Sequence, residues 1–236
     1  MTHPRHTMQR TALSRWLLGV AAAALAGGVA LAGAPAAQAR VHSVSPGDEI
    51  DVQHGRTGSR CTLGYTFTDP TSHITYGITA GHCNDGNHSP VIDRTTGSTG
   101  RFVYSEATPS EPLYADFGLI DFGASRSVRL MYHQPVGTIA AIDPTKPVCH
   151  DGIRTGIACG QYAGRLIADQ YLTTGMPKSI PGDSGGPVWQ PSRDGSATII
   201  GIWLGQHVDQ DGAFGRFTSL TDVLPTISAQ AKTRIL

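Results

Sequence analysis

The sequence predicts an all-β fold of short strands, arranged as a barrel or a sandwich, with one helix at the C-terminus. Three observations support this prediction. The 236-residue chain contains 29 glycines and 15 prolines, and such a content of turn-forming residues is typical of all-β domains. Short runs of β-branched and aromatic residues recur along the chain, separated by clusters of turn-forming residues. After residue 40, a convincing helical pattern is found only near the C-terminus.

The predicted strands follow one another from residue 62 to residue 217. In each of them Thr, Val, Ile, Tyr, Phe or Trp recurs, and these residues are enriched in strands. In chain order they are residues 62–67, 73–79, 100–104, 115–122, 137–142, 164–168, 187–189, 198–204 and 214–217. Turn-forming clusters lie between them, for example at Asn84 to Asn87. Arg193-Asp194-Gly195 separates two of the runs and predicts the tip of a hairpin.

The last element is expected to be a helix from about Ser219 to Ala231. Ser219 or Thr221 can cap its N-terminus with a side-chain oxygen. Pro225 is compatible with the helix if it lies in the first turn. Residues 144–147, with a proline at each end, are the best candidate for a crossing between two halves of the chain.

Composition and charge exclude two classes of protein. The chain has 18 basic and 18 acidic residues, and 39% of its residues are hydrophobic. A nucleic-acid-binding protein needs an excess of basic residues to contact phosphates, so we expect no nucleic-acid partner. A disordered chain has fewer hydrophobic residues and a larger net charge. The composition therefore predicts a globular domain, and a chain of this length can bury a sizeable core.

Residues 1–39 have the pattern of a signal peptide. Arg5, Arg10 and Arg15 precede an uncharged run, rich in Ala and Leu, from Trp16 to Ala34. Ala37-Gln38-Ala39 then supplies the small residues that a signal peptidase requires. The alternative, an uncleaved membrane anchor, is disfavoured because the run is weakly apolar and leads directly into the cleavage pattern. We expect a secreted domain of residues 40–236, extracellular or in the cell envelope, with no membrane anchor after processing.

The cysteines agree with export. The four are Cys61, Cys83, Cys149 and Cys159, and an even number in an exported chain predicts two disulfides. Of the three possible pairings, the one that closes the shortest loops joins Cys61 to Cys83 and Cys149 to Cys159. Zinc is the alternative, because His73, His82 and His88 lie near Cys83. No Cys-x-x-Cys or His-x-x-x-His spacing is present, so we expect no metal.

The strongest functional signal is the segment from Pro181 to Pro187, in which Ser184 is surrounded by glycines. Small neighbours let a substrate carbonyl approach the Ser184 hydroxyl closely. Gly182 lets the backbone turn so that its N–H group and that of Ser184 point at one spot. Two such donors stabilise a developing oxyanion, typically by about 3–4 kcal/mol each. The alternative is an ordinary glycine-rich turn.

Two further motifs supply a base and a carboxylate. Thr79 to Cys83 places His82 at the end of an apolar strand, beside a cysteine whose disulfide would fix the ring. Histidine suits proton transfer at neutral pH because its ordinary pKa is near 6.5. Asp116 enters an apolar strand, where a carboxylate is costly unless it is hydrogen-bonded, and the Nδ1–H group of His82 is its natural partner. Asp121 is the competing carboxylate, but it faces the other side of the strand and borders a turn.

The order His82, Asp116, Ser184, with these local motifs, resembles the chymotrypsin-like serine proteases, and the small secreted bacterial members most closely. Residues 148–160 also resemble a segment of these enzymes in their pattern of Cys, Gly, Thr-Gly and Cys-Gly. The resemblance spans roughly residues 58–224, through motifs rather than continuous identity.

This resemblance implies two antiparallel six-stranded β-barrels packed across a cleft, with the active site between them. The first barrel would span about residues 40–140 and the second about residues 148–236. The family also implies the two disulfides favoured above. No cofactor or metal is implied, and we expect a monomer that acts on peptide or protein substrates.

The resemblance further implies a secreted serine endopeptidase that works through an acyl-enzyme. Ser184 would attack the peptide carbonyl while His82 takes its proton, and Asp116 would hold the imidazole in the correct tautomer. The N–H groups of Gly182 and Ser184 would form the oxyanion hole.

Two alternatives differ in class. A secreted, non-catalytic binding module on a protease fold is disfavoured by the intact triad. An α/β-hydrolase esterase would share the Gly-x-Ser-x-Gly motif, but it needs an Asp and a His after the serine. Only His207 follows Ser184, and no alternation of strands and helices is present.

Asp183 should need a cationic partner if it is buried. The candidates are Arg154 and a protonated His150, whose pKa such a pair would raise.

The substrate pocket is expected to include Lys178, Ser179, Trp203 and Leu204. Trypsin-like members carry an acidic residue where Lys178 stands, so a cation here argues against cleavage after Lys or Arg. If Lys178 points inward, the pocket favours acidic residues. If it extends to solvent, Trp203 and Leu204 leave a mid-sized apolar pocket. The second version is favoured, because a buried unpaired ammonium is costly.

Overall fold

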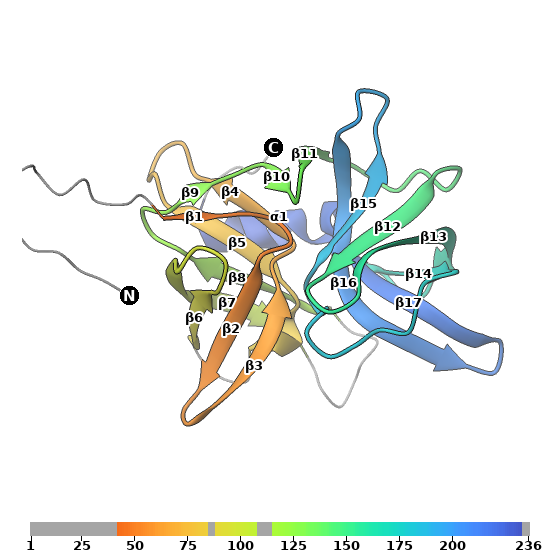
Figure 1. Cartoon of the computed structure of the whole chain (residues 1–236), viewed down its shortest axis with the longest axis horizontal. Helices are drawn as coiled ribbons and strands as arrows, with labels where there is room; N and C mark the ends of the chain where they lie inside the picture. Colours follow the sequence, from red (N-terminus) through yellow and green to blue (C-terminus); the bar gives the residue numbers. More distant parts are fainter. Residues whose placement is uncertain (1–41, 85–87, 108–114, 233–236) are drawn as a thin grey trace, which may run out of the picture. The chain divides into compact units, whose positions relative to one another are not determined.

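A computed structural model describes residues 42–84, 88–107 and 115–232 of the chain. These residues all belong to one compact unit, residues 40–236. The predicted signal peptide and part of the turn from Asn84 to Asn87 lie outside the described residues. Most of the secondary structure in the described part is β-strand, and most strands belong to two sheets that occupy separate halves of the unit (Figure 1).

The first sheet is a curved half-barrel of seven antiparallel strands. In spatial order they are β3 (Thr57–Thr62), β2 (Glu49–His54), β6 (Pro90–Asp93), β7 (Thr99–Glu106), β8 (Phe117–Asp121), β5 (Thr75–Thr79) and β4 (Tyr65–Thr68). The two edge strands, β3 and β4, are consecutive in the chain and are joined by Leu63 and Gly64. The Leu63 N–H group donates to the Asp48 carbonyl at 2.9 Å, and the Gly64 N–H group donates to the Ile78 carbonyl at 2.8 Å. The bend is therefore bonded both to Asp48, directly before β2, and to β5. The described residues of this half do not form the closed six-stranded barrel that was expected.

The second sheet contains a closed six-stranded barrel, as expected. Its strands are β12 (Pro147–Gly152), β13 (Gly156–Arg165), β14 (Gln170–Thr174), β15 (Pro187–Pro191), β16 (Ala197–Asp209) and β17 (Gly212–Ser219). Neighbouring strands are antiparallel, and the pairing of β16 with β17 closes the ring. Arg193-Asp194-Gly195 lies in the turn between β15 and β16, which confirms the predicted hairpin.

Four further strands lie outside the barrel and the half-barrel. β11 (Gln134–Ile139) pairs with β16 in parallel, and β10 (Leu130–Met131) pairs with β11. β1 (Ser43–Val44) pairs with β9 (Arg126–Ser127). Because β10 and β11 already belong to the second sheet, the chain reaches that sheet before residues 144–147, which were expected to carry the crossing.

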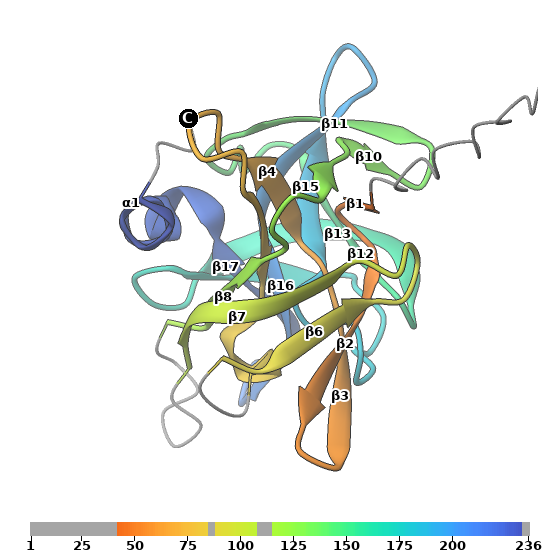
Figure 2. The same cartoon turned by 90° about the vertical axis from the view of Figure 1, so that its left-hand side faces the viewer.

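The C-terminal helix α1 (Leu220–Ala231) begins directly after β17 (Figure 2). Ser219 is at its N-cap, but its hydroxyl bonds to that of Thr221 at 3.0 Å and not to a backbone N–H of the first turn. Its buried residues recur every three or four positions, as in a helix with one apolar face: Leu220, Val223, Leu224, Ile227 and Ala231. Pro225 lies in the sixth position, beyond the first turn, and it deprives the Thr221 carbonyl of its helical donor. Pro225 is exposed, so water can reach that part of the helix. The described part of the chain contains no helix long and apolar enough to cross a membrane.

The largest hydrophobic cluster connects the two halves. Ile78 and Leu119 of the first sheet, Ile199 and Ile202 of β16, and Leu220 of α1 all belong to it. A separate cluster fills the barrel: Val148, Val188, Ile200, Trp203 and Phe217. The shared cluster holds one half against the other, and so fixes the relative positions of residues that each half contributes to a site.

Both predicted disulfides are confirmed. Cys61 of β3 is bonded to Cys83 of the short 3-10 helix η1 (Gly81–Cys83). Cys149 and Cys159 are bonded to each other and lie directly opposite on β12 and β13. Since Cys83 is bonded to sulfur, it cannot serve the zinc alternative. The described residues contain no group of three or more His, Cys, Asp or Glu side chains that could hold a metal ion.

Candidate active site

His82 is held by a tight turn at the end of β5. It is the middle residue of η1, between Gly81 and the disulfide-bonded Cys83. A Cβ atom on Gly81 would lie 2.0 Å from the Glu106 carbonyl oxygen, so only glycine fits at that position. The His82 side chain is 38% exposed, and its ring is therefore accessible to a substrate.

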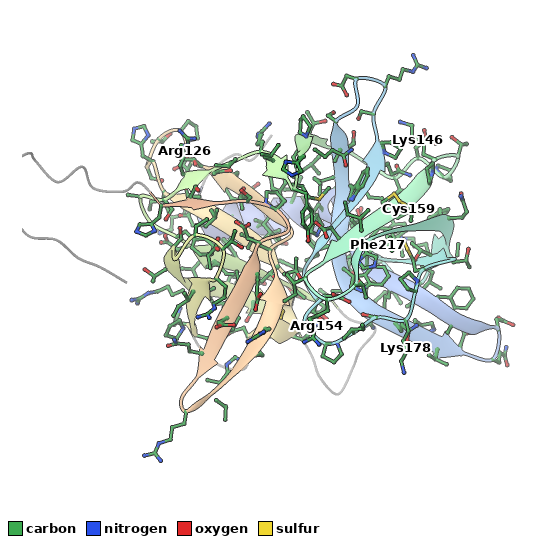
Figure 3. The ribbon with its side chains drawn as sticks, in the orientation of Figure 1. Arg126, Lys146, Arg154, Cys159, Lys178 and Phe217 are labelled. Carbon is green, nitrogen blue, oxygen red and sulfur yellow. A yellow bond between two sulfur atoms is a disulfide. The ribbon has the colours of Figure 1, made fainter. Side chains whose placement is uncertain are left out.

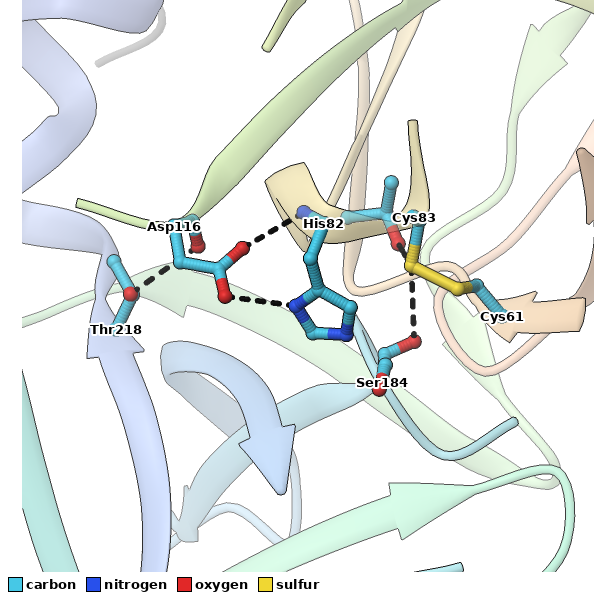
Figure 4. A network of polar contacts seen from close by, with 7 residues as sticks. Cys61, His82, Cys83, Asp116, Ser184 and Thr218 are labelled. Atoms are coloured by element: carbon cyan, nitrogen blue, oxygen red, sulfur yellow. Dashed lines mark hydrogen bonds and ion pairs between the residues drawn. A yellow bond between two sulfur atoms is a disulfide. The ribbon is translucent and has the colours of Figure 1, made fainter. Parts of the chain in front are cut away.

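Asp116 binds both the ring and the backbone of His82 (Figure 4). Its Oδ2 atom lies 2.7 Å from His82 Nδ1, and its Oδ1 atom accepts the His82 backbone N–H at 2.9 Å. Asp116 is 8% exposed, and its backbone carbonyl accepts the Thr218 hydroxyl of β17 at 3.3 Å. The competing carboxylate, Asp121, instead accepts the backbone N–H of Gly123 at 2.7 Å. An ionised Asp116 makes Nδ1 a donor, which leaves Nε2 of His82 free to accept a proton.

Ser184 lies on the opposite side of the His82 ring from Asp116 (Figure 4). The backbone on either side of it is left-handed, with φ of +113° at Gly182 and +85° at Gly185, a region that favours glycine. A Cβ atom on Gly185 would lie 1.9 Å from the Thr79 hydroxyl oxygen. Gly185 therefore lets the serine loop of the second half approach the first half closely.

A cleft of about 400 Å³ brings together the base, the serine and one predicted oxyanion donor. Its lining residues come from both halves of the unit: Ser59, Arg60, Cys61, His82, Cys83, Ser179, Ile180, Pro181, Gly182, Ser184, Leu204, Gly205 and Gln206. Ser179 and Leu204, two of the predicted pocket residues, are among them.

Lys178 and Trp203 were both expected among the pocket residues, but neither lines this cleft. The Lys178 side chain is exposed, as in the favoured version of the predicted pocket (Figure 3). Trp203 is fully buried in the barrel cluster, and its Nε1–H group donates to the Ser179 hydroxyl at 3.0 Å. The indole thus lies behind Ser179 and supports the pocket rather than facing it.

Among the described residues, backbone N–H groups rather than a cationic side chain bind Asp183. This residue is fully buried. Its carboxylate accepts the N–H groups of Arg154 at 2.9 Å, Thr155 at 3.0 Å and Ile180 at 3.1 Å. These three N–H donors satisfy the hydrogen-bonding capacity of the buried carboxylate without an ion pair. The expected pairing with the Arg154 guanidinium or with charged His150 is therefore wrong.

His150 is buried in the barrel as a neutral ring. It is fully buried and stacks on Trp203 with 4.1 Å between ring centroids, and neither ring nitrogen has a hydrogen-bond partner among the described residues. Burial lowers the pKa of His150 to about 4, although the nearby Asp183 acts in the opposite direction. The expectation of a raised pKa is wrong, because the loss of hydration outweighs the attraction of one carboxylate.

We expect His150→Phe to remove a pH dependence of stability. The unfolded His150 binds a proton below about pH 6.5, whereas the folded ring resists protonation down to about pH 4. The contribution of the neutral ring is therefore present above pH 6.5 and is lost as the pH falls toward 4, by about 3 kcal/mol. Denaturant unfolding at pH 7 and pH 4 measures it. Between pH 7 and pH 4, the difference in free energy of unfolding between the two proteins should shift by that amount in favour of the variant. A difference that is the same at both pH values would contradict the assignment of His150 as a buried neutral ring. Asp151 and the other titratable groups are present in both proteins, so the comparison isolates the contribution of His150.

Sequence comparison finds relatives of unknown function. No family profile matches the sequence. Two Mycobacterium tuberculosis proteins, uncharacterized protein MT1863 of strain CDC 1551 and uncharacterized protein Rv1815 of strain H37Rv, are each 34% identical over 157 residues. The matched region covers 61% of this chain and 66% of each relative, slightly less than two thirds of their length.

Structure comparison finds bacterial proteases. The Nocardiopsis protease is 20% identical, with a TM-score of 0.59 over 78% of this chain and 96% of that protease. Thermobifida fusca protease A is 22% identical, with a TM-score of 0.59 over 79% and 96%. The Cellulomonas bogoriensis chymotrypsin is 21% identical, with a TM-score of 0.57 over 79% and 96%. Since nearly all of each protease is matched, the chain has the chymotrypsin-like fold of the bacterial serine proteases.

Proposed function

We propose that the protein is a secreted serine endopeptidase with His82, Asp116 and Ser184 as its catalytic residues. One observation carries the proposal. His82 and Ser184, from distant segments, line one cleft, and the Asp116 carboxylate lies 2.7 Å from His82 Nδ1. The fold that the chain shares with bacterial serine proteases supports the same function, and two disulfides suit an oxidising compartment.

In the proposed mechanism, His82 carries the proton in both steps. Nε2 of His82 accepts the Ser184 hydroxyl proton as Oγ attacks the peptide carbonyl, and Asp116 stabilises the resulting imidazolium. The N–H groups of Gly182 and Ser184 bind the oxyanion. His82 then gives the proton to the leaving amine, and an acyl-enzyme remains on Ser184. Water attacks this ester with His82 again acting as the base, which restores the serine.

We further propose that the enzyme cleaves after uncharged side chains of moderate size. Ser179, Ile180, Leu204 and Gly205 line the cleft together with Ser184. No acidic residue is among the described residues that line the cleft, so a cationic substrate side chain would lack a partner there. Lys178 is exposed and does not line the cleft, and Arg60, which does, is paired with Glu49 at 3.2 Å. Profiling cleavage over a peptide library should show a preference for apolar residues, and a dominant preference for Arg, Lys, Asp or Glu would contradict this assignment.

A fluorophosphonate or sulfonyl fluoride tests the proposed class directly. Such reagents react with a serine that a neighbouring base activates, so we expect stoichiometric labelling, with the label on the peptide that contains Ser184. Peptide hydrolysis should be lost in step with labelling. A folded protein that neither reacts nor hydrolyses a broad peptide library would favour a non-catalytic binding module.

A further inference from the structure

Thr62 connects the first half of the unit to the serine loop of the second half. It is fully buried at the end of β3, next to Cys61. Its backbone N–H donates to the Ser184 carbonyl at 2.8 Å, and its hydroxyl donates to the Gly182 carbonyl at 2.8 Å. The hydroxyl oxygen also accepts the Ile153 N–H at 3.2 Å. Both the donor and the acceptor capacity of this hydroxyl are thus used across the boundary between the halves.

The two accepting carbonyls lie on either side of a catalytically important peptide unit. The Gly182 carbonyl belongs to the peptide that joins Gly182 to Asp183, and the Ser184 carbonyl belongs to the peptide that joins Ser184 to Gly185. Between them lies the peptide that carries the Ser184 N–H group. Because each peptide unit is planar, fixing the units before and after it limits the directions in which that N–H can point.

We infer that Thr62 is a positioning residue for the oxyanion hole, an inference that rests on the proposed function. Its hydroxyl holds the Gly182 peptide and its backbone N–H holds the Ser184 peptide. Donors aimed in advance at a developing charge are more effective than donors that must reorient during the reaction. Thr62 therefore acts on the transition state through Gly182 and Ser184 without touching the substrate carbonyl.

Thr79 extends this network toward the catalytic base. Its hydroxyl donates to the Thr62 carbonyl at 2.8 Å, and it is fully buried in β5, three residues before His82. The strand that leads to the base and the loop that carries the nucleophile are therefore both bonded to Thr62. This arrangement fixes the two sides of the cleft against each other.

Thr62→Val tests the inference, because it keeps the shape and the backbone N–H while it removes the hydroxyl. We expect kcat for peptide hydrolysis to fall about tenfold to a hundredfold with little change in KM, since a misaligned donor affects the transition state more than the bound substrate. Thr62→Ser retains the hydroxyl and should recover most of kcat. Affinity for a peptide boronic acid, which forms a tetrahedral adduct, should fall in parallel with kcat in Thr62→Val.

Thr66→Val is the matched control. Thr66 is also fully buried in the first sheet, but its hydroxyl is bonded to that of Ser127 at 2.8 Å, away from the serine loop. This variant should keep the kcat of the wild type, although both valine variants lose stability. If Thr62→Val does not fold, Thr79→Val removes the hydroxyl that orients Thr62, and it should lower kcat in the same direction by a smaller factor.

The outcomes separate this inference from the proposed function. If the wild type hydrolyses peptides and reacts with a fluorophosphonate, either of two results overturns the inference alone. One is an unchanged kcat in Thr62→Val, and the other is a loss of kcat in Thr66→Val equal to that in Thr62→Val. If Thr62→Val does not fold, an unchanged kcat in Thr79→Val likewise overturns the inference alone. A wild type that neither hydrolyses peptides nor reacts with a fluorophosphonate overturns the proposed function, and the inference with it.

Discussion

Replacing Ser184 by alanine should lower peptide hydrolysis by at least about 10⁴-fold and leave the protein folded. The substitution removes the nucleophilic oxygen. It keeps the backbone carbonyl that accepts the Thr62 N–H at 2.8 Å, so the loop stays anchored. Ser184 is only partly buried, and the loss of its hydroxyl should change the free energy of unfolding by less than about 1 kcal/mol. Steady-state kinetics and thermal unfolding of the same preparation measure both effects.

Ser196→Ala provides the control for this experiment. Ser196 lies in the turn between β15 and β16, where its hydroxyl donates to Asp194 at 2.7 Å, and it does not line the cleft. Its replacement should leave both turnover and fluorophosphonate labelling unchanged. If Ser184→Ala retained turnover within tenfold of the wild type, another residue would have to be the nucleophile.

Replacing Asp116 by asparagine should lower kcat by about 10⁴-fold, as the corresponding change does in the Ser-His-Asp template. The two oxygens of Asp116 have different partners, since Oδ1 accepts the His82 backbone N–H and Oδ2 faces Nδ1. In the variant the amide oxygen must stay on the backbone N–H, so the NH₂ group faces Nδ1. A donor facing Nδ1 turns that nitrogen into an acceptor and moves the ring proton to Nε2. His82 then cannot accept the proton of Ser184.

Asp121→Asn is the matched control, because Asp121 lies only five residues away, at the end of β8, and bonds to the Gly123 N–H at 2.7 Å. This change should leave kcat within a factor of two or so of the wild type. NMR of the histidine ring nitrogens can follow the tautomer of His82 directly. Equal losses in the two variants would mean that a general effect of charge, rather than the tautomer, governs the rate.

The predictions from sequence were most successful where the signal is local. Residues 73–79 and 115–122 were expected to be strands, and they correspond closely to β5 and β8. The predicted strand 198–204 lies within β16, which extends to Asp209. The predictions failed where tertiary contacts decide the structure. The predicted strand 62–67 is broken into β3 and β4 at Gly64, because a Cβ atom there would lie 2.4 Å from the Gly185 carbonyl oxygen. The sequence contains no local trace of that contact.

Strand β12 was missed for a different reason. Its sequence, Pro147 to Gly152, includes His150 and Asp151, and polar residues of this kind are depleted in strands. Both are nevertheless almost completely buried. Burial raises the pKa of Asp151 to about 7, with Asp183 nearby adding to the effect. A buried strand with polar residues does not show the apolar pattern by which strands are predicted.

The site shows the same division between local and distant signals. His82, Asp116 and Ser184 are carried by recognisable motifs, so their positions could be proposed from the sequence. Thr62, Thr79 and Thr218 could not, because a threonine hydroxyl has no role until its partner is known. The carbonyls that accept the Thr62 and Thr218 hydroxyls belong to residues more than 100 positions away. The environment of Asp183 was missed because backbone N–H groups leave no signature in the sequence.

The long separation between Thr62 and Gly182 also bears on the order in which the protein is made and folded. These residues are 120 positions apart, and Thr218 and Asp116 are 102 apart. Closing such loops costs chain entropy before any contact compensates for it, which makes folding slow. During synthesis, the segments with His82 and Asp116 emerge well before Ser184, and Thr218 emerges last of all. A nascent or truncated chain therefore lacks the assembled site, and under the proposed function it would not digest its surroundings until β17 has joined the barrel.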